Sequence, residues 1–163
     1  MMTAARPHAA AKAVLLAALA VSAPALAWET RASSDGGFEA RQTANAAVKV
    51  AGGADAKPVL AVSCESNGLF VTLSWPDAIL LKPNQHFAGV AWSLDGKVRS
   101  SSMIASSGSV SLAGSEAKEW LREMAAAGRL EVRVPDAHGG QSASFDLAGA
   151  KDVQSGLARS RCG

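Results

Sequence analysis

Apolar and polar residues alternate along several short segments of the chain, and this period of two is typical of β-strands with one buried face. The clearest case is Arg129 to Val134, where leucine and valine alternate with arginine and glutamate. A continuous apolar run over Val59 to Cys64 predicts a more central strand. The other predicted strands are Trp28 to Arg31, Leu69 to Trp75, Ala88 to Leu94, Lys97 to Ala105 and Ala143 to Leu147.

Two short turn sequences join neighbouring strands into predicted hairpins. Ser66-Asn67-Gly68 and Asp95-Gly96 both end in glycine after a residue that tolerates positive φ, which tight hairpin turns require. Phe38 to Val50 has a mixed pattern that predicts no particular element, and Ala51 to Lys57 is expected to be a loop. The serine-rich segment Ser100 to Ser111 fits either an edge strand or an exposed loop.

One segment has the spacing of an amphipathic helix, predicted over Glu116 to Ala127. Ser115 is the expected N-cap, and Gly128 stands where a glycine stops a helix. A second, short helix is predicted over Asp152 to Ser160, which would bring Cys162 toward the body of the protein. The apolar stripe of the first helix comprises Ala117, Trp120, Leu121, Met124 and Ala125.

These elements predict a mainly β fold of the α+β class: an antiparallel, β-sandwich-like domain with one clear helix and a short C-terminal helix. No alternating series of strands and helices is present, so a parallel nucleotide-binding sheet is not expected. The tryptophans at 75, 92 and 120 each lie on an apolar face and are expected in the core.

The first 27 residues have the three-part order of a secretory signal peptide. Arg6 and Lys12 make a basic start, Ala13 to Val21 is an apolar run, and Ala25-Leu26-Ala27 has the small-x-small form of a cleavage site. The apolar run is too short to span a bilayer. We expect cleavage after Ala27, leaving residues 28–163 as a single exported domain in the periplasm or outside the cell.

The charge of the remaining chain excludes some partners. The 16 basic and 14 acidic residues give a net charge of +2, and Arg6 and Lys12 account for that excess. A balanced domain lacks the basic excess that nucleic acids and anionic membranes attract, and no later segment is apolar enough to span a membrane.

Cys64 and Cys162 are the two cysteines of the chain, and they are far apart in sequence. No CxxC redox or zinc motif is therefore present. In an oxidising compartment one structural disulfide is the expected outcome, and two buried free thiols are the alternative.

The sequence contains no pattern that indicates catalysis, a cofactor or a metal site. A nucleophilic serine would need a base, yet no G-x-S-x-G elbow is present and His86 and His138 stand alone. Their spacing fits no zinc motif, and the paired glycines lack a phosphate-binding pattern. We therefore expect a protein that is not an enzyme. The candidates for partner binding are Trp28, next to the new N-terminus, and Arg129 and Arg133, which share the outward face of one strand.

Several segments of the chain follow one another in an order that is found in a known family. They are Lys57 to Cys64, Leu69 to Trp75, Val90 to Lys97, Trp120-Leu121, Leu130 to Arg133, Ser144 to Gly149 and Cys162. This order resembles that of the VasI/TagO proteins, exported accessory factors of bacterial type VI secretion. The resemblance implies a periplasmic, non-enzymatic role in assembling an envelope machine by contact with another envelope protein. A fainter resemblance is to the invasion-associated locus B proteins.

The alternative function is a small-ligand-binding or hydrolase-inhibitor domain that uses the hairpin Ser100 to Gly108.

Overall fold

The computed structural model describes residues 28–32, 36–49, 55–76, 85–135 and 140–163. The predicted signal peptide and His138 lie outside these residues, as does part of the predicted loop at 51–57. β3 (Val48–Lys49) and β4 (Asp55–Ala56) form a separate two-stranded sheet. The main sheet contains β1 (Glu29–Ala32), β2 (Phe38–Thr43), β5 (Val59–Glu65), β6 (Gly68–Ser74), β7 (Phe87–Leu94), β8 (Lys97–Ser106), β9 (Ser109–Ala113), β10 (Arg129–Val134) and β11 (Gln141–Asp146).

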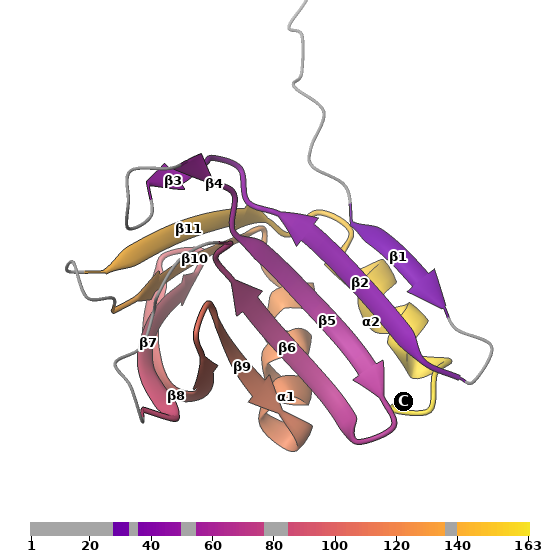
Figure 1. Cartoon of the computed structure of the whole chain (residues 1–163). Helices are drawn as coiled ribbons and strands as arrows, with labels where there is room; N and C mark the ends of the chain where they lie inside the picture. The colour runs from indigo at the N-terminus through magenta and orange to yellow at the C-terminus, as the bar shows by residue number, and fades with distance from the viewer. Residues whose placement is uncertain (1–27, 33–35, 50–54, 77–84, 136–139) are drawn as a thin grey trace, which may run out of the picture.

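The nine strands of the main sheet are ordered β1-β2-β5-β6-β9-β8-β7-β10-β11, and each neighbouring pair is antiparallel (Figure 1). The sheet curls on itself, so that β11 reaches the residues that follow β2. There the Asn45 N–H donates to the Ser144 carbonyl at 2.9 Å, and Gln42 Nε2 donates to the Asp146 carbonyl. The predicted mainly β, antiparallel fold with two helices is confirmed, and one continuous curved sheet provides its layers.

The two helices pack on the same side of the sheet, α1 (Gly114–Ala125) against β6 and β9, and α2 (Ala150–Ala158) against β2 (Figure 1). The buried residues of α1 are the five that the helical spacing predicted. Trp75, Trp92 and Trp120 belong to the core, as expected. The rings of Trp92 and Trp120 meet edge to face with centroids 5.3 Å apart.

The boundaries of both helices differ from the prediction. Ser115 is not the N-cap of α1, because the helix already begins at Gly114 and Ala113 is the residue before it. Gly114 has a φ of +61°, a value that lets the chain turn from β9 directly into the helix. At the other end, Ala126 is the C-cap, so the helix ends before Gly128 can act as its terminator. The second helix begins two residues before the predicted Asp152, at Ala150.

The Asp95-Gly96 hairpin is confirmed. Leu94 pairs with Lys97, and the two residues between them have φ values of +48° and +82°, as a type I′ turn requires. In the first hairpin Glu65 pairs with Gly68, so the turn residues are Ser66 and Asn67, and the positive φ falls on Gly68 alone.

Segments without a firm prediction also form strands. Phe38 to Val50 contains β2 and β3, and Ser100 to Ser111 contains most of β8 and the start of β9. The β8–β9 connection is therefore a two-residue turn, Ser107-Gly108, instead of a long exposed loop.

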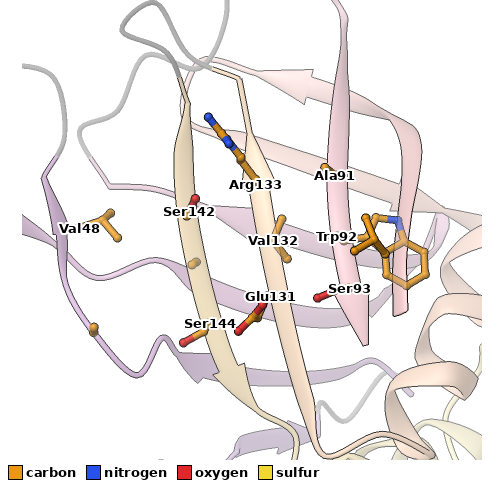
Figure 2. Close-up of a pocket in the computed structure, with 12 residues that line it drawn as sticks. Val48, Ala91, Trp92, Ser93, Glu131, Val132, Arg133, Ser142 and Ser144 are labelled. Atoms are coloured by element: carbon orange, nitrogen blue, oxygen red, sulfur yellow. The ribbon is translucent and has the colours of Figure 1, made fainter. Parts of the chain in front are cut away.

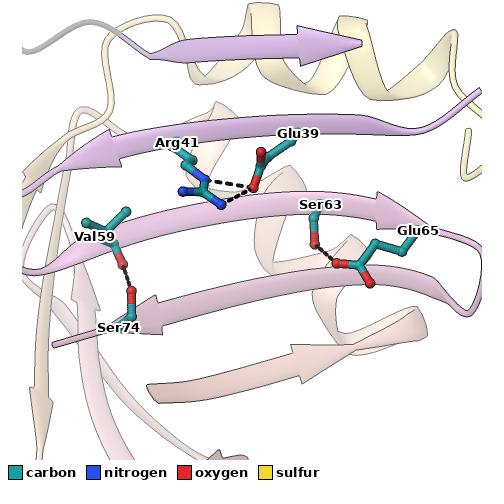
Figure 3. Close-up of polar contacts among 6 residues, drawn as sticks. All are labelled: Glu39, Arg41, Val59, Ser63, Glu65 and Ser74. Carbon is teal, nitrogen blue, oxygen red and sulfur yellow. Dashed lines mark hydrogen bonds and ion pairs between the residues drawn. The ribbon is translucent and has the colours of Figure 1, made fainter. Parts of the chain in front are cut away.

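Several polar contacts lie on the outer face of β2, β5 and β6. Arg41 forms an ion pair with Glu39, and Ser63 donates to Glu65 (Figure 3). These contacts lie at the surface, where such pairs contribute little to stability.

A disulfide joins Cys64 at the end of β5 to Cys162, which confirms the predicted bridge over the free-thiol alternative. The chain near Cys162 is also held by a hydrogen bond from the Arg161 N–H to the Gly36 carbonyl at 3.1 Å. The bridge therefore ties the segment after α2 to the first half of the sheet.

Candidate functional site: a groove on the outer face of the sheet

A groove of about 420 Å³ crosses the outward face of β7, β10 and β11 (Figure 2). Strand register explains its shape, because residues paired across an antiparallel sheet project on the same face. Ser93 pairs with Glu131, which pairs with Ser144. One step along, the same three strands align Ala91, Arg133 and Ser142. Small side chains on β7 and β11 thus leave the space that forms the groove.

Apolar residues from two other strands border this groove. Val48 of β3 lies beyond β11 (Figure 2). On the opposite side of the groove, Val98 of β8 pairs with Ser93. Val98 is 77% exposed, unusually high for a valine in a strand. Small side chains, some of them serines, therefore form the floor of the groove, and a valine borders the floor on each side.

The two arginines predicted as partner-binding residues have different positions here. Arg133 lines the groove, and it lies close to Gly140, where an added Cβ would be 3.3 Å from Arg133 Nε. Arg129 does not line the groove and instead forms an ion pair with Glu131 at 3.0 Å. The outward row predicted from the sequence is present, and of its two arginines Arg133 is the one at the groove.

Trp28 does not line the groove either. It packs, half-buried, against the core and against the start of α2, where a Cβ on Gly149 would lie 3.3 Å from Trp28 Cδ1. Its indole N–H is buried and has no hydrogen-bond partner among the described residues. The structure thus gives Trp28 a packing contact next to β1.

The groove has the chemistry of a binding surface. Among the described residues, its lining includes serine hydroxyls, one arginine and one glutamate, but no histidine, cysteine or aspartate. His86 is exposed just before β7, and its carbonyl accepts a hydrogen bond from the Ala105 N–H. Among the described residues, no group of three or more histidine, cysteine, aspartate or glutamate side chains is placed to hold a metal ion.

Sequence reasoning did not find this groove. Its signal is a set of small outward residues on three strands, and that set becomes visible only when the register between β7 and β10 is known. These strands are far apart in sequence, so no turn sets their register.

No family model, curated protein or solved structure matches the chain. No helix in the described part of the chain is long and apolar enough to cross a membrane.

Proposed function

We propose that this protein is an exported, periplasmic interaction module that binds another envelope protein through the outer-face groove, without catalysing a reaction. Its segment order, similar to that of the VasI/TagO proteins, supports a narrower form, an accessory role in assembling a type VI secretion machine. The leader pattern of residues 1–27 supports export, and a disulfide suits an oxidising compartment.

The groove carries this proposal. An apolar or aromatic side chain of a partner would fit over Ala91 and Ser142, where the floor is low, and contact Val48 and Val98 on either side. Arg133 at the border offers a charged donor for a carboxylate or carbonyl of the partner. A small apolar centre with a polar rim is the usual anatomy of a protein–protein interface.

A small-molecule ligand is the second candidate. The groove volume of about 420 Å³ lies within the range of small-ligand pockets, which supports this alternative. Crosslinking distinguishes the two candidates, because only a covalently attached protein partner gives an adduct that migrates as a separate, larger band on a gel.

Site-specific photocrosslinking in the producing cell tests the proposal. A photoreactive residue at Ala91, inside the groove, should give one discrete adduct that mass spectrometry identifies as an envelope protein, and Ser142→Arg should abolish it by filling the groove. The matched control places the photoreactive residue at Lys151, which is exposed on α2. Identical adducts from both positions, or none from Ala91, would count against a protein partner, and ligand screening would follow.

The export part has its own test. The mass of protein recovered from the periplasm should correspond to a chain that begins at Trp28. A recovered chain that still contains Leu15 and Leu16 would refute cleavage after Ala27.

A further inference from the structure

Most of β8 has no paired strand on one side. β8 contains ten residues, and β9 pairs with only three of them, Ile104 to Ser106. β9 continues to Ala113, but its last two residues, Leu112 and Ala113, pair with β6 and not with β8. No described residue pairs with this side of β8 between Lys97 and Met103. The sheet therefore contains an open edge in its interior, between β8 and the helix.

The register shows which main-chain groups this edge presents. Leu94 and Lys97 close a two-residue hairpin and are hydrogen-bonded to each other, so every second residue of β8 from Lys97 onward directs its N–H and C=O to β7. The hydrogen bond from the Ala105 N–H to the His86 carbonyl fits this alternation of hydrogen-bond directions along β8. The alternate residues Ser100 and Ser102 therefore direct their N–H and C=O groups away from β7, into the opening.

A groove of about 450 Å³ lies along this edge, between β8 and α1. One end is closed where Arg99 forms a 2.7 Å ion pair with Glu123 and covers the Trp92 ring, 5.5 Å from its centroid. Trp120 also lines the groove; it is 3% exposed, and its indole N–H has no partner among the described residues.

The charge of this groove is negative. Among the described residues, three glutamates of α1 and one arginine of β8 line it, which gives a net charge of −2. Glu116 and Glu119 are exposed on the helix at the groove, and the contact of Glu119 with Arg122 is long, at 3.6 Å. An unpaired strand edge beside carboxylates favours an extended ligand with positive side chains.

We propose that this groove binds an extended peptide segment with lysine or arginine at alternate positions, which adds to the β8 edge at Ser100 and Ser102 and directs its positive side chains toward Glu116 and Glu119. The period of two places one face of such a strand toward α1. A second copy of this chain is disfavoured as the occupant, because two grooves that face each other would bring like charges together. This site is separate from the outer-face groove, so it does not depend on the proposed function.

Amide hydrogen exchange resolved by residue tests the edge itself. In the free protein, Ser100 and Ser102 should exchange fast while Arg99 and Ser101 exchange slowly, because only the latter two donate to β7. A uniformly slow β8 would overturn the proposal, since the edge would then already be paired.

Binding is tested with a fluorescein-labelled synthetic peptide of four lysine–threonine repeats. Two control peptides replace lysine by glutamate, which reverses the charge, or threonine by proline, which removes half of the backbone donors. The lysine–threonine peptide should bind at least about tenfold more tightly than either control at low salt. It should also slow exchange at Ser100 and Ser102.

Variants separate the groove from general charge attraction. Glu116→Gln with Glu119→Gln should weaken binding of the peptide by roughly tenfold. The control pair Glu29→Gln with Glu65→Gln, which makes the same charge change at other exposed positions, should leave it unchanged. Any of four results would overturn the proposal. Both pairs of variants could lose the same affinity for the peptide, or the proline peptide could bind as tightly as the lysine–threonine peptide. The other two results are no binding at millimolar peptide and no added protection of the Ser100 and Ser102 amides.

Discussion

Removing the Cys64–Cys162 disulfide should produce a large loss of stability. The two cysteines are 98 positions apart, and on the chain-entropy model a closed loop of about 100 residues stabilises the folded state by about 4.7 kcal/mol. The bond acts mainly by restricting the unfolded chain, since it removes conformations that the open chain would occupy. This value is a large fraction of the 5–15 kcal/mol typical of domains.

The assay is urea unfolding of residues 28–163, followed by tryptophan fluorescence. Three samples are compared: oxidised protein, the same protein held in reductant, and the variant Cys64→Ala with Cys162→Ala. With a urea slope of about 1–3 kcal/mol/M, the midpoint should fall by at least about 1.5 M on reduction. The reduced protein keeps both side chains, so its difference from the double variant isolates the packing contribution of the two sulfur atoms.

A small difference between the oxidised and reduced proteins would refute this reasoning. If their free energies of unfolding lie within about 1 kcal/mol of each other, the unfolded chain gains little conformational freedom when the bond opens. Thiol counting in denaturant without reductant should find no free thiol, and two free thiols per chain would contradict the bridge itself.

Three further changes test the core and the hairpin turn. Trp120→Ala should cost about 3–5 kcal/mol in urea unfolding, because it deletes a buried ring that packs on another tryptophan, and a loss below 1 kcal/mol would contradict the packing. Asp95→Ala should lower the free energy of unfolding by about 1–3 kcal/mol, because the Asp95 carboxylate accepts hydrogen bonds from the backbone N–H groups of Gly128 and Arg129, between α1 and β10. The control is Asp55→Ala, which removes an exposed ion pair and should change the free energy of unfolding by less than about 0.5 kcal/mol. Gly96→Ala should cost about 1–2 kcal/mol at its φ of +82°, whereas Gly89→Ala, which has open space and no positive φ, should not destabilise; equal effects would refute the role of the turn.

The local parts of the fold were predictable where one periodicity dominated. β10 has the predicted bounds because its alternation is unbroken over Arg129 to Val134. The buried face of α1 was predicted because its apolar spacing does not depend on where the helix begins. The helix start was missed because it is set by the positive φ of Gly114, and a glycine before a serine gives no sequence signal for that conformation.

The sequence patterns did not predict how the strands are arranged in the sheet. Three strand pairs, β2–β5, β6–β9 and β7–β10, join segments that no tight turn connects. Both grooves depend on these pairs: β7–β10 aligns Ala91 with Arg133, and β9, which pairs along β6, leaves Ser100 and Ser102 of β8 unpaired on that side. Arg133 was predicted as a binding residue from its outward position alone, and the surfaces around it required the register.

The long separation between the two bridged cysteines also sets the order of events during synthesis. A ribosome adding about 5–20 residues per second needs roughly 5–20 s to make the 98 residues that follow Cys64. During that interval the Cys64 thiol has no native partner, although β5 and β6 are adjacent in sequence and can already form their hairpin. Whatever oxidises this protein must therefore act late, and it must reach a sulfur that is almost completely covered in the finished fold. Oxidation is thus expected to accompany the docking of α2 and of the segment after it that contains Cys162.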